Sequence, residues 1–353
     1  MKHHFLSRAS KAVLMTALAA ALGATAARAD DSLSLISPKA ADRIAAKRAT
    51  VIHRHARPAN TEAGKFFKNT GRPVAPRSSP AAWERSEQPH RYPGDLSYLG
   101  GPVVESAESH AIYMLPNGHC PIPQCWGNPE GFLRDLGRSD FIHLVDQYIG
   151  LSGDDRYTVA PRTKIRYTPP AAPFTDNDML AVVHAVASAT MQTGYGHIYH
   201  VFLPPGQDEC FTATDGVCYS PDNPNTFFFC AYHGSVDFTD IGHVLYSVEP
   251  YQNVGGCSVK PGTPNGQVID STNNSLSHET IETITDPDGD AWINFSLVVL
   301  AGSEIGDECS FFIILPPAPG TAYFDPFSFE IGNHDYAVQP EYSNSDHDCA
   351  TGP

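Results

Sequence analysis

The sequence has little positive charge beyond its first quarter. From residue 96 onward it contains 7 Lys and Arg against 32 Asp and Glu, whereas residues 30–95 contain 12 against 7. Residues 96–353 are thus strongly acidic, and a region of this charge repels nucleic acid and anionic membranes. We therefore expect neither as a partner, and we expect many carboxylates to be available for cations.

Several catalytic and cofactor-binding motifs are absent from the sequence. There is no G-x-S-x-G turn for a serine nucleophile, and no G-x-G-x-x-G turn or P-loop for a nucleotide. No C-x-x-C pair is present, which disfavours a cysteine zinc site. After the first 29 residues, no run is long and apolar enough to span a bilayer.

The first 29 residues have the order of a secretory signal. Basic residues at Lys2, Arg8 and Lys11 precede an alanine-rich apolar run that closes on Ala27 and Ala29. Because this run is short and lacks a bulky apolar core, we expect cleavage after Ala29 rather than a membrane anchor. The prediction is a secreted, extracellular or periplasmic protein.

Eight cysteines lie in the part expected to be exported. An even number in an oxidising compartment predicts four disulfides. Short loops close at a lower entropic cost, which favours pairing between nearest neighbours. The expected pairs are Cys120 with Cys125, Cys210 with Cys218, Cys230 with Cys257, and Cys309 with Cys349. No cysteine would then remain as a nucleophile.

Two regions follow the signal. Residues 30–95 are rich in Ala, Arg, Pro and Ser, with a short helix around 40–54, and they predict a disordered linker or a pro-segment. Residues 96–353 are long enough for one buried core. Strand-like runs occur at 110–115, 198–203, 227–232 and 243–248, and helical patterns at 129–137, 140–149, 176–191 and 273–285. This alternation predicts a single α/β or α+β domain whose central mixed sheet is covered by helices.

The strongest chemical motif is the H-E-x-x-E run at 278–282. On a helix, His278 and Glu282 project from one face one turn apart, the spacing of the two metal ligands in H-E-x-x-H helices. Glu279 would stand beside the ion, where a carboxylate can accept the proton of an activated water molecule. Glu304 and Asp307 are both candidates for a third ligand of Zn²⁺. The competing interpretation is an ordinary solvated helix.

A second cation hypothesis concerns the residues that follow this helix. Asp286, Asp288 and Asp290 alternate as at the start of a calcium loop, although Ala291 and Leu297 stand where such a loop has glycine and glutamate. Ca²⁺ is therefore a secondary hypothesis, and an ordinary turn is the alternative.

The other histidines carry weaker signals. His233 follows a buried-looking strand close to Cys230, a position that favours a structural histidine over one that reaches a cleft. His197 and His200 flank another strand without ligand spacing to their sequence neighbours.

Taken in order, these motifs resemble the secreted bacterial branch of the phosphate-induced protein, or EXORDIUM-like, family. The similarity runs through 100–104, 202–206, 230–234, 277–287, 304–309 and 341–344. The resemblance covers most of the region from about 96 to 349 and none of the segment before it. Its most specific pieces are H-E-x-x-E-x-x-T-D-P and E-I-G-D-x-C. The resemblance implies an extracellular domain of zincin-like appearance with metallopeptidase activity.

Two functions compete as hypotheses. The first is a secreted zinc-dependent hydrolase, most simply a metallopeptidase that acts on a peptide or protein. The second is a non-catalytic extracellular protein that binds cell-wall polysaccharide or another glycan. For the second, the 15 Tyr and 18 Phe could supply a stacking surface.

Overall fold

The computed structural model describes residues 32–33, 50–56, 95–170, 172–214, 216–223, 226–294, 304–310, 314–318, 321–324 and 326–353. The segment expected to be a signal lies outside the described residues, as does most of the segment 30–95. No helix in these ranges is both long and apolar enough to cross a membrane.

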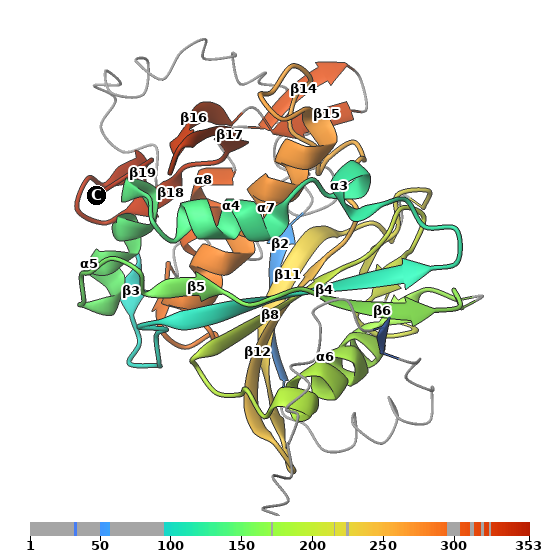
Figure 1. Cartoon of the computed structure of the whole chain (residues 1–353). Coiled ribbons are helices and arrows are strands. Elements are labelled where there is room, and N and C mark those ends of the chain that lie inside the picture. Colours follow the sequence, from blue (N-terminus) through green and yellow to red (C-terminus); the bar gives the residue numbers. More distant parts are fainter. Residues whose placement is uncertain are drawn as a thin grey trace, which may run out of the picture.

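A mixed sheet runs through the centre of the domain (Figure 1). Its strands are β1 Ser32–Leu33, β2 Thr50–Ala56, β4 Ala107–Pro116, β5 Tyr157–Val159, β6 Thr163–Tyr167, β8 His197–Phe202, β11 Phe229–Phe238 and β12 Gly242–Glu249. Their order is β1-β6-β4-β8-β12-β11-β2, and β5 also pairs with β4. β11 is antiparallel to both neighbours, whereas the other pairs are parallel. The mixed sheet expected from the sequence is confirmed.

Helices cover both faces of this sheet. The helices in the described ranges are α3 Ile122–Cys125, α4 Pro129–Leu136, the 3-10 helix η2 Asp140–Val145, α5 Asp146–Ile149, α6 Asp176–Thr190, α7 Gln267–Thr285 and α8 Ile305–Ser310. Successive strand residues point to opposite faces. Ile112 and Met114 of β4 therefore pack in the core under α6, whereas Ala111 and Tyr113 pack in the core that includes α7. Figure 1 shows α6 on one side of the sheet and α4 and α7 on the other.

Short strands complete the domain. They are β3 Ser97–Tyr98, β7 Phe174–Thr175, β9 Glu209–Cys210, β10 Cys218–Tyr219, β13 Trp292–Ile293, β14 Ile314–Ala318, β15 Thr321–Phe324, β16 Phe327–Ile331, β17 His334–Val338, β18 Glu341–Ser343 and β19 Asp348–Ala350. β17 lies against α7, and β18 lies against α8. Helix α7 is thereby enclosed between the central sheet and the C-terminal hairpins (Figure 1).

Local sequence explains where two of the helices begin. Asn128 precedes α4, and its side chain accepts a hydrogen bond from the Gly131 N–H at 3.2 Å, which satisfies an unpaired amide of the first turn. Thr175 and Asp178 form a reciprocal capping box at the start of α6. These caps set the starts of α4 and α6 close to those expected from the sequence.

Several expected elements differ from the structure. The helix expected over 140–149 is the 3-10 helix η2 up to Val145 and continues as α5. Helix α7 begins at Gln267, six residues before the expected start, because burial overrides the weak helix propensity of the Ser, Thr and Asn residues at 271–275. The helix expected over 40–54 is wrong for its last part, since Thr50–Ala56 forms β2 at the edge of the sheet. Thr50, Val51 and Ile52 favour a strand, and β11 supplies the pairing edge. The rest of 40–54 lies outside the described residues.

The structure pairs the eight cysteines as nearest neighbours, as expected: Cys120–Cys125, Cys210–Cys218, Cys230–Cys257 and Cys309–Cys349. The last of these bonds ties α8 to β19, across 40 residues of sequence. Four disulfides are typical of a protein in an oxidising environment outside the cytoplasm.

Candidate metal centre

Helix α7 is buried from Asp270 to Thr285. Only Leu276, Ile281 and Ile284 are aliphatic in this stretch, and the other positions are polar or charged. Burying polar groups costs free energy unless they find partners. The composition of α7 therefore indicates a polar site inside the protein, and the interpretation of 278–282 as part of a solvated surface is wrong.

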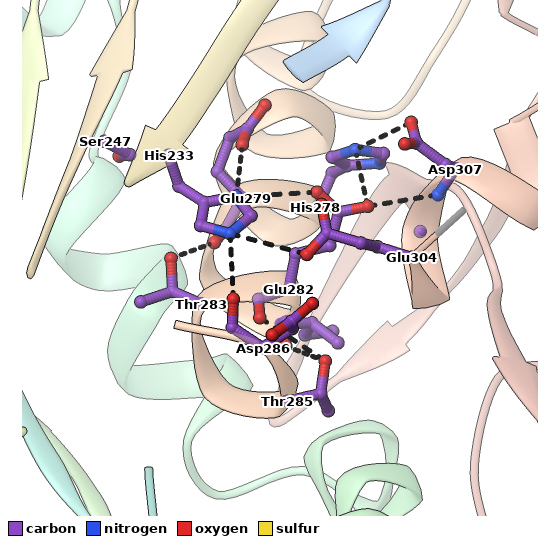
Figure 2. A network of polar contacts seen from close by, with 12 residues as sticks. His233, Ser247, His278, Glu279, Glu282, Thr283, Thr285, Asp286, Glu304 and Asp307 are labelled. Atoms are coloured by element: carbon purple, nitrogen blue, oxygen red, sulfur yellow. Dashed lines mark hydrogen bonds and ion pairs between the residues drawn. The ribbon is translucent and has the colours of Figure 1, made fainter. Parts of the chain in front are cut away.

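The two predicted ligands on α7 lie side by side (Figure 2). His278 Nε2 is 3.1 Å from Glu282 Oε1, as expected for residues one turn apart. Asp307, on α8, brings its Oδ1 to 3.6 Å from the same His278 nitrogen. The backbone N–H of Asp307 also donates to Glu282 Oε1 at 3.1 Å. These three side chains form one compact group.

His233 reaches the same cluster from the sheet. Its Nδ1 lies 3.2 Å from Glu279 Oε2 and 3.6 Å from Glu282 Oε2, and its Nε2 lies 3.6 Å from Glu304 Oε1. The sequence favoured a structural role for His233 near Cys230. The structure places its imidazole among the carboxylates of Glu279, Glu282 and Glu304, and its Nε2 lies 3.4 Å from the backbone carbonyl oxygen of Asp286 at the end of α7. Glu304 thus contacts His233, whereas Asp307 contacts His278.

The cluster is closed to solvent and rich in acid. His233, His278, Glu279 and Glu282 are fully buried, and Glu304 and Asp307 are nearly so. The elements that supply them contain no Lys or Arg, and no Lys or Arg follows Lys260 in the whole sequence. Buried charges are normally paired or bound to metal ions. A cation is the group that would balance this cluster.

The pKa shifts in the cluster show that its ionised carboxylates are unfavourable in the absence of a bound cation. Burial raises the pKa of Glu304 and Asp307 well above the usual range, and nearby carboxylates, first among them Glu282, raise it further. Glu341 on β18 is shifted upward by the same two causes. Burial lowers the pKa of His278 to about 3, so its imidazole is neutral at pH 7, the form that binds metals. Imidazole nitrogen together with carboxylate oxygen suits Zn²⁺ better than Ca²⁺, which takes oxygen ligands.

A glycine allows α8 to approach α7. A Cβ at Gly306 would lie 2.5 Å from His278 Nδ1 and 2.9 Å from Glu341 Oε2. Gln339 donates to the Gly306 carbonyl at 2.7 Å and holds this part of α8 in place. Any side chain at position 306 would therefore displace the residues of the cluster.

Two carboxylates of the turn after α7 have partners of their own. Asp286 Oδ1 accepts a hydrogen bond from the Ala291 N–H at 2.8 Å. Asp288 instead binds the Tyr195 hydroxyl at 2.5 Å and His243 Nε2 at 3.2 Å. These two carboxylates therefore have different partners, and the calcium loop stays a secondary hypothesis.

A second group of possible ligands was not visible from sequence spacing. Glu108 and His110 on β4 lie close to His197 on β8. Burial, followed by the nearby His197, lowers the pKa of His110 to about 4. His200 points the other way and contacts the hydroxyls of Ser247 and Ser109 at 2.9 and 3.2 Å. Adjacent parallel strands bring Glu108, His110 and His197 together, although 87 residues separate the two histidines.

Strand β2 borders the metal-centre candidate. It pairs with β11 on the side opposite β12, and the register sets residue 53 opposite His233. β2 also lies near α7 and α8. A strand from the segment expected to be a linker or pro-segment therefore runs along the edge of the sheet beside the cluster.

Together, fold and site define a disulfide-bonded, mixed α/β protein with a buried group of histidines and carboxylates suited to a divalent metal ion. No protein-family model, curated protein or solved structure matches this chain. The EXORDIUM-like resemblance and the zincin-like assignment remain hypotheses.

Proposed function

We propose that this protein is an exported metal-dependent hydrolase, most simply a zinc peptidase. One observation carries the proposal: possible ligand atoms of His278, Glu282 and Asp307 all lie within 4.8 Å of one another in the interior. Two of these residues belong to the H-E-x-x-E helix, and the third comes from the E-I-G-D-x-C run. The four disulfides support a site of action outside the cytoplasm.

Each residue has a distinct role in this proposal. His278, Glu282 and Asp307 would hold the ion, which would supply Lewis-acid polarisation of a scissile carbonyl and a more acidic water. Glu279 accepts a proton from the attacking water. His233 orients the Glu279 carboxylate, whose Oε2 lies 3.2 Å from Nδ1.

Strand β2, which belongs to the segment 30–95 (called the leader below), suggests how a substrate reaches a buried site. β2 occupies the edge of the sheet at β11 and lies near α7 and α8. Release of the leader would leave β11 as the edge strand, and an extended peptide can pair with such an edge through its backbone. In this proposal, residues 30–95 act as a pro-segment that covers the site until they are removed.

The first experiment measures zinc content and peptide hydrolysis in the purified chain and three variants. His278→Asn should lose about one zinc per chain and all hydrolysis. Glu279→Gln should keep its zinc and lose about 10²–10⁴-fold in rate. His334→Asn, at an exposed histidine paired with Asp135, is the control and should change neither. Unchanged zinc in a folded His278→Asn protein would refute the site, and full activity in Glu279→Gln would refute the role of that residue.

A second experiment separates the hydrolase from a glycan-binding protein. A chelator should abolish hydrolysis, and added zinc should restore it. A non-catalytic wall-binding protein would instead keep its affinity for polysaccharide after chelation and show no hydrolysis at any stage.

A third experiment tests the leader. Limited proteolysis within 57–94, followed by separation of the released piece, should raise peptide hydrolysis. Equal or higher activity in the uncut chain would show that the leader does not cover the site.

A further inference from the structure

Two histidines and one glutamate converge on the sheet, away from the α7 cluster. His110 Nε2 lies 3.0 Å from His197 Nδ1. Glu108 Oε2 lies 3.6 Å from the same His110 nitrogen and 3.9 Å from the same His197 nitrogen. Three donor atoms from three side chains thus face a common point.

Strand register produces this convergence. Glu108 and His110 are two residues apart on β4 and therefore project from the same face. His197 on β8 is the cross-strand partner of Glu108. By strand alternation this face is the one that carries Ile112 and Met114, which pack in the core with α6. The trio and the α7 cluster are therefore on opposite faces of the sheet.

We propose that Glu108, His110 and His197 form a second metal site, selective for a transition-metal ion of the zinc and copper class. A tetrahedral ion with bonds of about 2.0–2.1 Å separates its ligand atoms by about 3.3 Å. The three separations in the trio, 3.0, 3.6 and 3.9 Å, bracket this value. Two imidazoles with one carboxylate are softer than the all-oxygen sets of calcium and magnesium sites.

Neighbouring side chains hold the ligands in place. Gln192 donates to Glu108 Oε2 at 3.0 Å. The Tyr199 ring stacks on His110 with centroids 4.7 Å apart, and its hydroxyl donates to the Gln192 carbonyl at 2.6 Å. Such outer contacts fix the orientation of metal ligands.

The trio is also accessible. The His110 side chain is 9 % exposed, His197 is 23 % exposed and Glu108 is 33 % exposed. An ion can therefore enter from solvent, and a water molecule can complete its coordination. In the absence of an ion, the same two ring nitrogens are placed to share a hydrogen bond, so metal binding requires the tautomers that carry the N–H on the other nitrogen of each ring.

A bound ion would join the first residues of β4 and β8 and, through Gln192, the segment that follows α6. We expect the bound ion to raise the stability of the fold. The three ligands lie outside the residues assigned to hydrolysis, so loss of this ion should leave peptide hydrolysis unchanged.

The test is zinc titration of the whole purified chain by calorimetry, together with zinc content after dialysis. Wild type should bind one zinc more than His197→Gln, whether or not the α7 cluster also binds zinc. His110→Gln should behave like His197→Gln, and Gln192→Ala should weaken binding at this site about 10–100-fold. The matched control is His184→Gln, which removes a histidine of α6 that pairs with Asp240 on the same face of the sheet and should lose no zinc.

Copper gives a second readout, because electron paramagnetic resonance counts coordinated nitrogens. One equivalent of Cu²⁺ should show coupling to two imidazole nitrogens in a His278→Asn background, and His197→Gln should remove one of them. Unchanged zinc stoichiometry and affinity in folded His197→Gln and His110→Gln proteins would overturn the proposal, and the trio would then be a hydrogen-bonded histidine pair.

Discussion

The imidazole of His233 on β11 lies 3.2 Å from the carboxylate of Glu279 on α7, although 46 residues separate them in sequence. Both side chains are fully buried. This contact joins β11 to the H-E-x-x-E segment of helix α7 (Figure 2). It fixes the direction of the carboxylate to which the proposed mechanism assigns proton transfer.

The first prediction concerns this contact. His233→Asn keeps an amide nitrogen near the position of Nδ1, whereas His233→Gln places its amide near the position of Nε2. We expect about a 10²-fold loss of kcat in His233→Gln, because a small misplacement of a reacting group has an effect of this size. His233→Asn should retain more activity, and both variants should keep their zinc. Equal rates in the two variants would contradict an orienting role for Nδ1.

The second prediction separates the two candidates for the third ligand. Asp307 faces His278 at 3.6 Å, whereas Glu304 faces His233 at 3.6 Å. Asp307→Asn should therefore weaken zinc binding by at least 10–100-fold, which is the loss caused by changing a residue that only contacts a metal ligand. Glu304→Gln should weaken zinc binding less. Competition with a fluorescent zinc chelator measures both affinities. The reverse order would assign Glu304 as the ligand.

The third prediction concerns the disulfide behind the site. Cys309–Cys349 closes 40 residues and holds α8, which carries Asp307. Its replacement by alanines should lower the free energy of unfolding by about 4 kcal/mol and weaken zinc binding. The matched control is Cys120–Cys125, which closes 5 residues. Its removal should cost about 2 kcal/mol and leave zinc affinity unchanged. Equal zinc affinity in both double variants would show that the bond does not support the site.

The fourth prediction is a pH dependence of stability. Its first part concerns His243, whose pKa is raised by hydrogen bonding to Asp288, while burial opposes the shift and Asp237 adds to it. The stabilisation from His243 is therefore complete below its unfolded pKa of about 6.5 and is lost as the pH rises through the higher folded pKa.

Asp288 supplies the acid side of this dependence. Burial alone would raise its pKa, but hydrogen bonds from His243, Ser235 and Tyr195 lower it to about 2. Its contribution is present above about pH 3.9 and is lost as the pH falls toward 2. Denaturant unfolding should show that His243→Gln costs about 1–2 kcal/mol at pH 5 and clearly less at pH 8.5. The same cost at both values would contradict the ion pair.

Local information in the sequence determined several features of this protein. Helical spacing placed His278 and Glu282 on one face, because residues four apart are neighbours on any α-helix. Short separations along the chain favoured the four observed cysteine pairs, since small loops close at lower entropic cost. Alternation of strand and helix patterns predicted the mixed sheet and its helical cover.

Tertiary structure alone decided which distant residues meet. His233 joins the α7 cluster, and His197 meets Glu108 and His110, because strand order and register place them there. The histidines that Glu304 and Asp307 contact depend on how α8 packs against α7, which Gly306 permits. Sequence spacing carries no record of these contacts, because they arise from pairing between segments whose separation along the chain is unrelated to their distance in space.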